Sequence, residues 1–219
     1  MLKALIFDCD GVMFDSRETN RAYHDHLLAA FGLPKMNEEE LEYVHIHNVW
    51  ESVAYIFRNS AVPVDKVHEF RLRDDYRPFF RYMKMEPDLR QFLAMAKPRF
   101  KLAIATNRTN TMEPLLAEFG LTAFFDKVMT AENSRRPKPS PEPLLEIIET
   151  FACQIDEALY VGDSAIDEEC ARACAMPFAA FRNPRLTAHY HINSFMEIFA
   201  LPPVAIRMTE DRGQRAEKS

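Results

Sequence analysis

The chain has 219 residues, of which 47% are hydrophobic and 27% are charged, and its formal net charge is −6. A chain of this length can bury one full core and carry a smaller accessory domain. The negative charge argues against nucleic acid or an anionic membrane as the main partner, since either would need a basic face. A small anionic substrate is compatible with it, because such a ligand responds to the local charge of its pocket.

The first seven residues form an apolar run that meets Asp8 too early for a signal peptide or a membrane span. We therefore expect a cytoplasmic protein. The four cysteines include no Cys-x-x-Cys pair and are too sparse for a disulfide framework, so we expect reduced thiols.

Short apolar runs that each stop at a polar residue predict strands at 4–7, 102–105 and 158–161, with weaker signals at 128–129 and 177–181. Helical patterns alternate with the later strands, at 111–119, 141–151 and 167–173. This order predicts an α/β fold, a Rossmann-like parallel sheet covered by helices on both faces. Such sheets bind ligands beyond the carboxyl ends of their strands.

The segment from 16 to 86 breaks this alternation, with helical patterns near 17–31, 38–43, 49–58 and 65–83 and no clear strand signal. A helical insertion directly after the first strand predicts a lid over the site. We expect a core domain of residues 1–15 and 87–203 and an all-helical cap domain of residues 16–86. The polar, charged tail at 204–219 is expected to be disordered.

Asp8 and Asp10 close the first strand, and carboxylates two residues apart on extended chain point to the same side. In phosphoryl transfer, one acid of such a pair can be the nucleophile and the other the proton donor. A solvated Asp-x-Asp-Gly turn explains the motif equally well when it is taken alone.

Polar residues follow the later strands as well. Thr106 and Asn107 offer a hydroxyl and backbone N–H groups to phosphate oxygens, and Lys138 is held between two prolines. Asp163 and Asp167 add two carboxylates at the same edge of the sheet, and an oxygen-rich site without His or Cys suits Mg²⁺. Taken separately, each has a simpler explanation as a turn residue, a solvated lysine or a helix N-cap.

Together these pieces resemble the haloacid dehalogenase superfamily, whose motifs run in this order over nearly the whole chain. The residues that carry the resemblance are Phe7-Asp8-Cys9-Asp10-Gly11-Val12, Thr106-Asn107, Lys138-Pro139, and Gly162-Asp163 with Asp167. The chain is most similar to the branch of phosphoglycolate phosphatases and β-phosphoglucomutases, which have a small helical cap of the C1 type.

The resemblance implies a role for each motif residue. Asp8 is expected to be the nucleophile that forms an aspartyl phosphate, and Asp10 the general acid that later activates water. The residues expected to hold the phosphoryl group during its transfer are Thr106, Asn107 and Lys138. Magnesium would be bound by the Asp8 carboxylate, the Asp10 carbonyl and the Asp163 carboxylate, with Asp167 binding through water.

The cap would exclude water and select the leaving group. Candidate selection residues are Asn20, His47 and Trp50. We thus predict a Mg²⁺-dependent phosphatase that acts on a small phosphorylated metabolite, as a monomer or homodimer.

Asp10 argues against the dehalogenase branch, which lacks that acid, and against phosphonate hydrolysis, whose members have Ala there. A β-phosphoglucomutase-like isomerase stays an alternative, although the mutases carry His where this chain has Asn20. A receiver-type signalling domain would be shorter and would lack the insertion. A non-catalytic phosphate-binding or regulatory relative also stays possible, but the expected catalytic residues are all present.

Overall fold

The computed structural model describes residues 1–205, and its centre is a six-stranded parallel sheet in the order β5-β4-β1-β6-β7-β8. The strands are β1 (Ala4–Phe7), β4 (Lys101–Ala105), β5 (Lys127–Met129), β6 (Ala158–Gly162), β7 (Phe178–Phe181) and β8 (Tyr190–Ile192). The predicted α/β fold with a Rossmann-like parallel sheet is confirmed.

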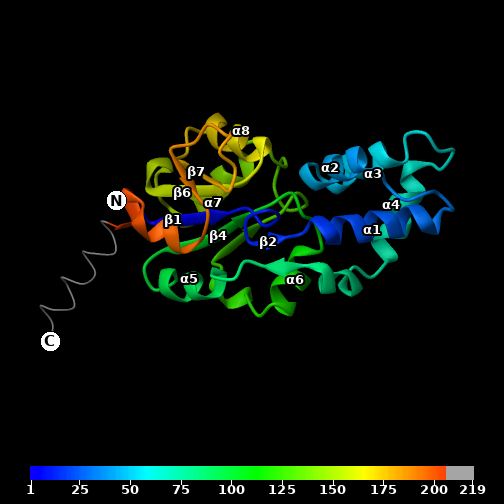
Figure 1. Ribbon diagram of the computed structural model, residues 1–219. Coiled ribbons are helices and arrows are strands. Elements are labelled where there is room, and N and C mark those ends of the chain that lie inside the picture. Colours follow the sequence, from blue (N-terminus) through cyan, green and yellow to red (C-terminus); the bar gives the residue numbers. More distant parts are fainter. Residues whose placement is uncertain (206–219) are drawn as a thin grey trace, which may run out of the picture.

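Strand β1 lies in the middle of the sheet, and all four of its residues are fully buried. Leu5 and Phe7 pack on one face against α5 (Leu89–Ala96) and α6 (Met112–Glu118), whereas Ala4 and Ile6 pack on the other face against α7 (Glu142–Phe151) and α8 (Ala165–Ala173). Because both faces are covered, the strand reads as an unbroken apolar run rather than as an alternating one. Figure 1 shows the two helical layers above and below the sheet.

The helices of this core are α5 (Leu89–Ala96), α6 (Met112–Glu118), α7 (Glu142–Phe151) and α8 (Ala165–Ala173). Among these helices and the strands of the six-stranded sheet, α5 and β8 have no counterpart in the predicted elements. Helix α5 buries Leu89, Phe92 and Leu93 at helical spacing, a signal that the sequence does contain. The edge strand β8 has only three residues, one of them buried, so its own pattern is too short to identify it.

The inserted segment contains α1 (Arg17–Ala30), α2 (Glu38–Ile46), α3 (Val49–Ile56), α4 (Val64–Arg73) and the 3₁₀ helix η1 (Arg77–Tyr82). Asn37 and Asn48 cap α2 and α3 with their side chains, which satisfies backbone N–H groups at the helix starts. The predicted single helix at 65–83 is wrong, because the chain is extended at Asp74. Pro78 supplies no N–H to continue an α-helix there.

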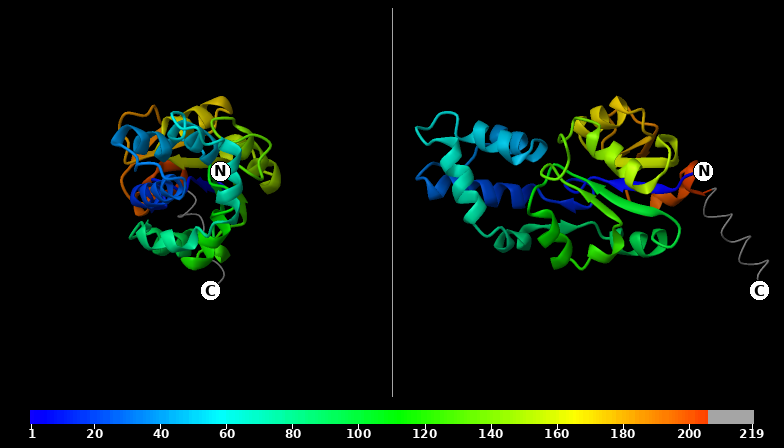
Figure 2. Two further views of the ribbon diagram at one scale, coloured as in Figure 1. Left: turned by 90° about the vertical axis from the view of Figure 1, so that its right-hand side faces the viewer. Right: turned by 180° about the vertical axis from the view of Figure 1, so that it is seen from behind.

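The cap helices bury an apolar cluster of their own, which includes Leu27, Leu41, Val53 and Val67. They lie together at one end of the molecule (Figure 2), joined to the sheet by two chain segments. These segments pair as the short antiparallel strands β2 (Phe14–Asp15) and β3 (Lys84–Met85). The exact division into a core and a cap of residues 16–86 stays a prediction.

The expected disordered tail at 204–219 needs a correction at its start. Val204 is fully buried in the main core, and the N–H groups of Val204 and Ala205 both donate to the carbonyl of Leu201. Residues 206–219 lie outside the described part of the chain. Within residues 1–205, none of the helices is both long and apolar enough to cross a lipid bilayer.

Candidate active site

Three neighbouring strands bring the motifs that contain Asp8, Thr106 and Asp163 to one edge of the sheet. Phe7 at the end of β1 pairs with Ile104 of β4 on one side and with Val161 of β6 on the other. Asp8, Thr106 and Asp163 follow these strand ends. The parallel register therefore gathers residues that are about 100 and 155 positions apart in the sequence, as the strand pattern predicts.

Lys138 lies in the middle of a buried network. Its Nζ is 2.8 Å from Oδ1 of Asp8 and 2.6 Å from Oδ1 of Asp167, and its side chain is only 3% exposed. The hydroxyl of Tyr160, on β6, lies 3.0 Å from the same Nζ. Burial alone would lower the pKa of Lys138, but the carboxylates of Asp167 and Asp8 outweigh it and raise the pKa above its ordinary value. Lys138 is a fixed cation beside Asp8.

Asp167 is fully buried at the start of α8, and donors from the protein contact both of its oxygens. Oδ1 accepts hydrogen bonds from Lys138 and from the hydroxyl of Tyr160 at 2.5 Å. Oδ2 accepts from the hydroxyl of Ser164 at 2.6 Å and from the Ser164 backbone N–H at 3.1 Å. Asp167 is thereby a support for Lys138, and its expected contact with Mg²⁺ through water stays a prediction.

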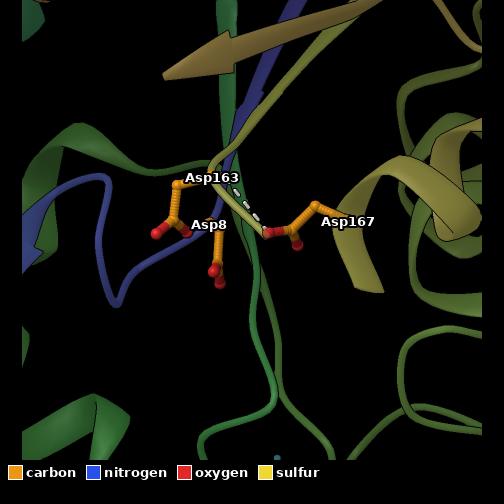
Figure 3. Close-up of side chains that lie close together, drawn as sticks. All are labelled: Asp8, Asp163 and Asp167. Carbon is orange, nitrogen blue, oxygen red and sulfur yellow. Dashed lines mark hydrogen bonds between the residues drawn. The ribbon is translucent and has the colours of Figure 1, made fainter. Parts of the chain in front are cut away.

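Asp8, Asp163 and Asp167 form an acidic cluster, since one carboxylate oxygen from each lies within 4.8 Å of the others. Figure 3 shows Asp8 and Asp163 side by side beyond the strand ends, with Asp167 reaching toward them from α8. Gly11 makes this approach possible: a Cβ there would lie 2.0 Å from Oδ2 of Asp163, and its φ is +79°. Only glycine fits at position 11 without moving the Asp163 carboxylate.

When fully ionised, the acidic cluster would hold more negative charge than its surroundings balance. Burial raises the pKa of Asp8 to about 7, against the opposing effect of Lys138. Burial and the neighbouring carboxylates of Asp167 and Asp8 raise the pKa of Asp163 to about 8. A divalent cation between Asp8 and Asp163 would relieve this repulsion, and all donors present are the oxygens that Mg²⁺ prefers. The residues present thus fit a magnesium ion.

Asp10 is bound to Arg108, an arginine outside the set predicted from the sequence. Arg108 donates from Nη2 to Oδ1 and from Nε to Oδ2 of Asp10, both at 2.7 Å. Burial favours a raised pKa for Asp10, but the charge and hydrogen bonds of Arg108 outweigh it and lower the pKa below its ordinary value. In this arrangement Asp10 is an ionised carboxylate.

Thr106 and Asn107 mainly make hydrogen bonds that fix their own loop and the loop of Lys138. Oγ1 of Thr106 accepts a hydrogen bond from the Arg108 N–H at 3.1 Å. The Asn107 amide donates to the Lys138 carbonyl and accepts from the Lys138 N–H, both at 3.0 Å. Asn107 therefore locks the backbone of Lys138 in place. The phosphate-binding roles of Thr106 and Asn107 stay predictions.

A cavity of about 120 Å³ joins this site to the cap, with Asp8, Asp10, Asp163, Lys138 and Arg108 among the residues that line it. That is room for several water molecules or a small ligand.

The cap residues predicted to select the substrate lie at different places. Asn20 and His47 line the cavity, and Nδ2 of Asn20 is 3.2 Å from Nδ1 of His45. The His47 ring stacks on that of Tyr43, with centroids 3.8 Å apart. Trp50 is 39% exposed and is not among the residues that line the cavity. The structure brings two of the three to the site and leaves Trp50 outside it.

Three residues beyond the predicted set complete the site, namely Arg108, Tyr160 and Ser164. A weak sequence signal exists for each. Arg108 directly follows the Thr-Asn motif, Tyr160 is a hydroxyl in an otherwise apolar strand, and Ser164 precedes a helix three residues before an acid. The sequence does not say which acid each would contact.

Comparison with known proteins places this geometry in a family. The model of the haloacid dehalogenase-like hydrolases matches residues 5–181. A phosphoglycolate phosphatase from Aquifex aeolicus is 27% identical over 183 residues, which is 78% of this chain and 80% of that protein. A putative pyrophosphatase PpaX from Caldanaerobacter subterraneus subsp. tengcongensis is 32% identical over 194 residues, 83% of this chain and 82% of that one.

Among solved structures, a HAD-superfamily hydrolase of subfamily IA from Geobacter sulfurreducens is 36% identical and superposes with a TM-score of 0.82, covering 92% of this chain and all of the other. The expected resemblance is confirmed by sequence and by fold. The chain belongs to the haloacid dehalogenase-like hydrolase family.

Proposed function

We propose that this protein is a Mg²⁺-dependent phosphatase that hydrolyses a small phosphate monoester through an aspartyl phosphate on Asp8. The chain is a phosphatase of the haloacid dehalogenase-like family, and phosphoglycolate phosphatases are among its relatives. The observation that carries the proposed mechanism is the position of Asp8, which lies between a fixed cation, Lys138, and a second carboxylate, Asp163.

The proposal gives Asp8 the role of nucleophile. Lys138 holds its Oδ1, which leaves Oδ2 to attack phosphorus while the bond from phosphorus to the leaving oxygen breaks. Lys138 also offers positive charge to the phosphoryl oxygens as their charge develops. Magnesium, bound by the carboxylates of Asp8 and Asp163 and by the Asp10 carbonyl, would supply further positive charge that offsets the repulsion between Asp8 and a dianionic phosphate.

Asp10 would donate a proton to the leaving oxygen and then accept one from the water that hydrolyses the aspartyl phosphate. In the structure Asp10 is ionised and paired with Arg108. It can act as an acid only after this ion pair loosens and the carboxylate takes up a proton. The observed pair is thus a resting arrangement in the proposed cycle.

The test is Mg²⁺-dependent release of p-nitrophenol from p-nitrophenyl phosphate, with Asp8→Asn as the key variant and Asp15→Asn as a control, because Asp15 is an exposed acid next to the cap. We expect Asp8→Asn to lose all measurable turnover and Asp15→Asn to keep it. Equal release by the wild type and Asp8→Asn would refute the covalent mechanism. Interconversion of glucose 1-phosphate and glucose 6-phosphate with little free phosphate would instead favour the mutase.

A further inference from the structure

One arginine in the cap is buried without an acidic partner. Arg71, on α4, is 7% exposed, and its Nε has no hydrogen-bond partner. Within residues 1–205, none of the carboxylates lies within ion-pair distance of its guanidinium. Arg108, by contrast, is paired with Asp10. A guanidinium that is largely withdrawn from bulk water without gaining an anion is costly, which points to a partner that arrives from outside the chain.

Arg71 is accessible to a ligand because it lines the same cavity as Asp8 and Lys138. Tyr23 and Tyr76 line that cavity as well, with ring centroids 4.7 Å apart. A molecule with its phosphoryl group at Asp8 would therefore extend toward the cap, where it would meet these two tyrosines and a cation.

A second unpartnered atom lies at this end of the cavity. Nδ1 of His24 donates to the carbonyl of Asn20 at 2.9 Å, which leaves Nε2 as an acceptor, and Nε2 has no partner in the described structure. Burial lowers the pKa of His24 to about 4, so the ring is neutral at physiological pH. The cap end thus offers one charged donor, Arg71, and one neutral acceptor, His24.

We propose that Arg71 binds a second anionic group of the substrate, so that the natural substrate is a phosphate monoester that also carries a carboxylate or another phosphoryl group. This inference rests on the proposed function, because it takes the reacting phosphoryl group to lie at Asp8. The guanidinium presents paired N–H donors that match the oxygens of either anion.

The test compares esters that differ only in the distal group: 2-phosphoglycolate with 2-hydroxyethyl phosphate for a carboxylate, and glucose 1,6-bisphosphate with glucose 1-phosphate for a phosphate. The measured quantity is the ratio of kcat/KM for the anionic ester to that for its neutral counterpart. In Arg71→Met this ratio falls roughly 10- to 100-fold for the preferred pair, the effect of one charge-assisted contact. The pair whose ratio falls identifies the anion.

Arg73→Met is the matched control, since Arg73 lies on the same helix, carries the same charge and is exposed. It leaves both ratios unchanged, whereas Arg71→Lys restores part of the loss. Circular dichroism and Tm establish that each variant is folded. Ratios that stay the same in a folded Arg71→Met, or that fall equally in Arg73→Met, would overturn the proposal.

A binding measurement separates this inference from the proposed function. In the Asp8→Asn background with Mg²⁺, the preferred anionic ester raises Tm, and the rise is largely lost when Arg71→Met is added. If the wild type hydrolysed none of the esters, the phosphatase proposal would fail, and an Arg71-dependent rise in Tm would still support the anion subsite. A rise of the same size without Arg71 would reject the subsite.

Discussion

Asp10 and Arg108 form the contact that most directly affects the proposed chemistry at the scale of single residues. The guanidinium contacts both carboxylate oxygens, and its side chain is 7% exposed. Because Arg108 stabilises the ionised form, it opposes the protonated form that a general acid needs. In the proposed mechanism, this contact must therefore change during each turnover.

Replacement of Arg108 tests this conclusion. Arg108→Met removes the charge that lowers the pKa of Asp10, so Asp10 stays protonated to higher pH. We expect the alkaline limb of the kcat profile for an ester with a poor leaving group to move to higher pH. The exposed Arg136 provides the control, and Arg136→Met leaves the limb in place. An unmoved limb in Arg108→Met would show that Arg108 does not set the pKa of Asp10.

Gly11 offers a second test at a single residue. Gly11→Ala places a Cβ against the Asp163 carboxylate, and we expect Mg²⁺-dependent activity to fall at least about 100-fold because a ligand moves by about 1 Å. Gly32→Ala is the control: Gly32 has φ of +70° but no atom within 4 Å of its added Cβ. It costs about 1 kcal/mol of unfolding free energy for the left-handed backbone and leaves activity intact. Similar activities in the two variants would contradict the site.

At the scale of elements, β6 and α8 build the support for Lys138. Tyr160 comes from the strand, and Ser164 and Asp167 come from the start of the helix. Gly162 lets the two elements meet, because a Cβ there would lie 2.4 Å from Cβ of Asp167. The junction of strand and helix thereby fixes the position of a cation on a different loop.

Tyr160→Phe measures this support. The variant removes a buried hydroxyl that donates to Asp167, so we expect the free energy of unfolding to fall by about 1–3 kcal/mol in urea titrations. We also expect kcat to fall, because Lys138 loses a neighbour at 3.0 Å. Tyr190→Phe, a partly exposed tyrosine on the edge strand β8, serves as the control. Equal stabilities for the two variants would mean that the network adds no stability.

The strand pattern in the sequence predicts that the main site residues lie at one edge of the sheet. Apolar runs that end at Asp8, Thr106 and Asp163 predict a common edge, since parallel strands align their carboxyl ends. The hydrogen-bond and ion-pair partners of each polar side chain could not be predicted, because a sequence does not give side-chain directions. Arg108 could equally have been a solvated arginine, and Trp50 could have faced the cavity rather than solvent.

At the scale of the whole molecule, the acidic cluster connects stability to pH and to Mg²⁺. Without metal, Asp8 and Asp163 together bind more protons in the folded protein than in the unfolded chain between about pH 4 and pH 8, because their pKa values are raised to about 7 and about 8. This contribution makes the metal-free protein less stable as pH rises across that window. Mg²⁺ needs the ionised carboxylates, so its stabilising effect grows over the same range.

Calorimetric scans with and without Mg²⁺ at pH 6.0 and 8.5 test the linkage. We expect Mg²⁺ to raise Tm more at pH 8.5 than at pH 6.0. Without metal at pH 8.5, Asp163→Asn should melt above the wild type by roughly 5 °C, since it removes a repelled charge, and it should lose most of the Mg²⁺ effect. A larger Mg²⁺ effect at pH 6.0, or an undiminished one in Asp163→Asn, would argue against this site.

Carboxylates from the ends of β1 and β6 are proposed to meet around one divalent cation beside Lys138. The most direct measurement is the anomalous scattering of Mn²⁺ in crystals of the wild-type protein. We predict a peak about 2.2 Å from a carboxylate oxygen of Asp8 and from one of Asp163, as in oxygen-ligated sites. A peak at other residues, or no peak at saturating Mn²⁺, would contradict the claim.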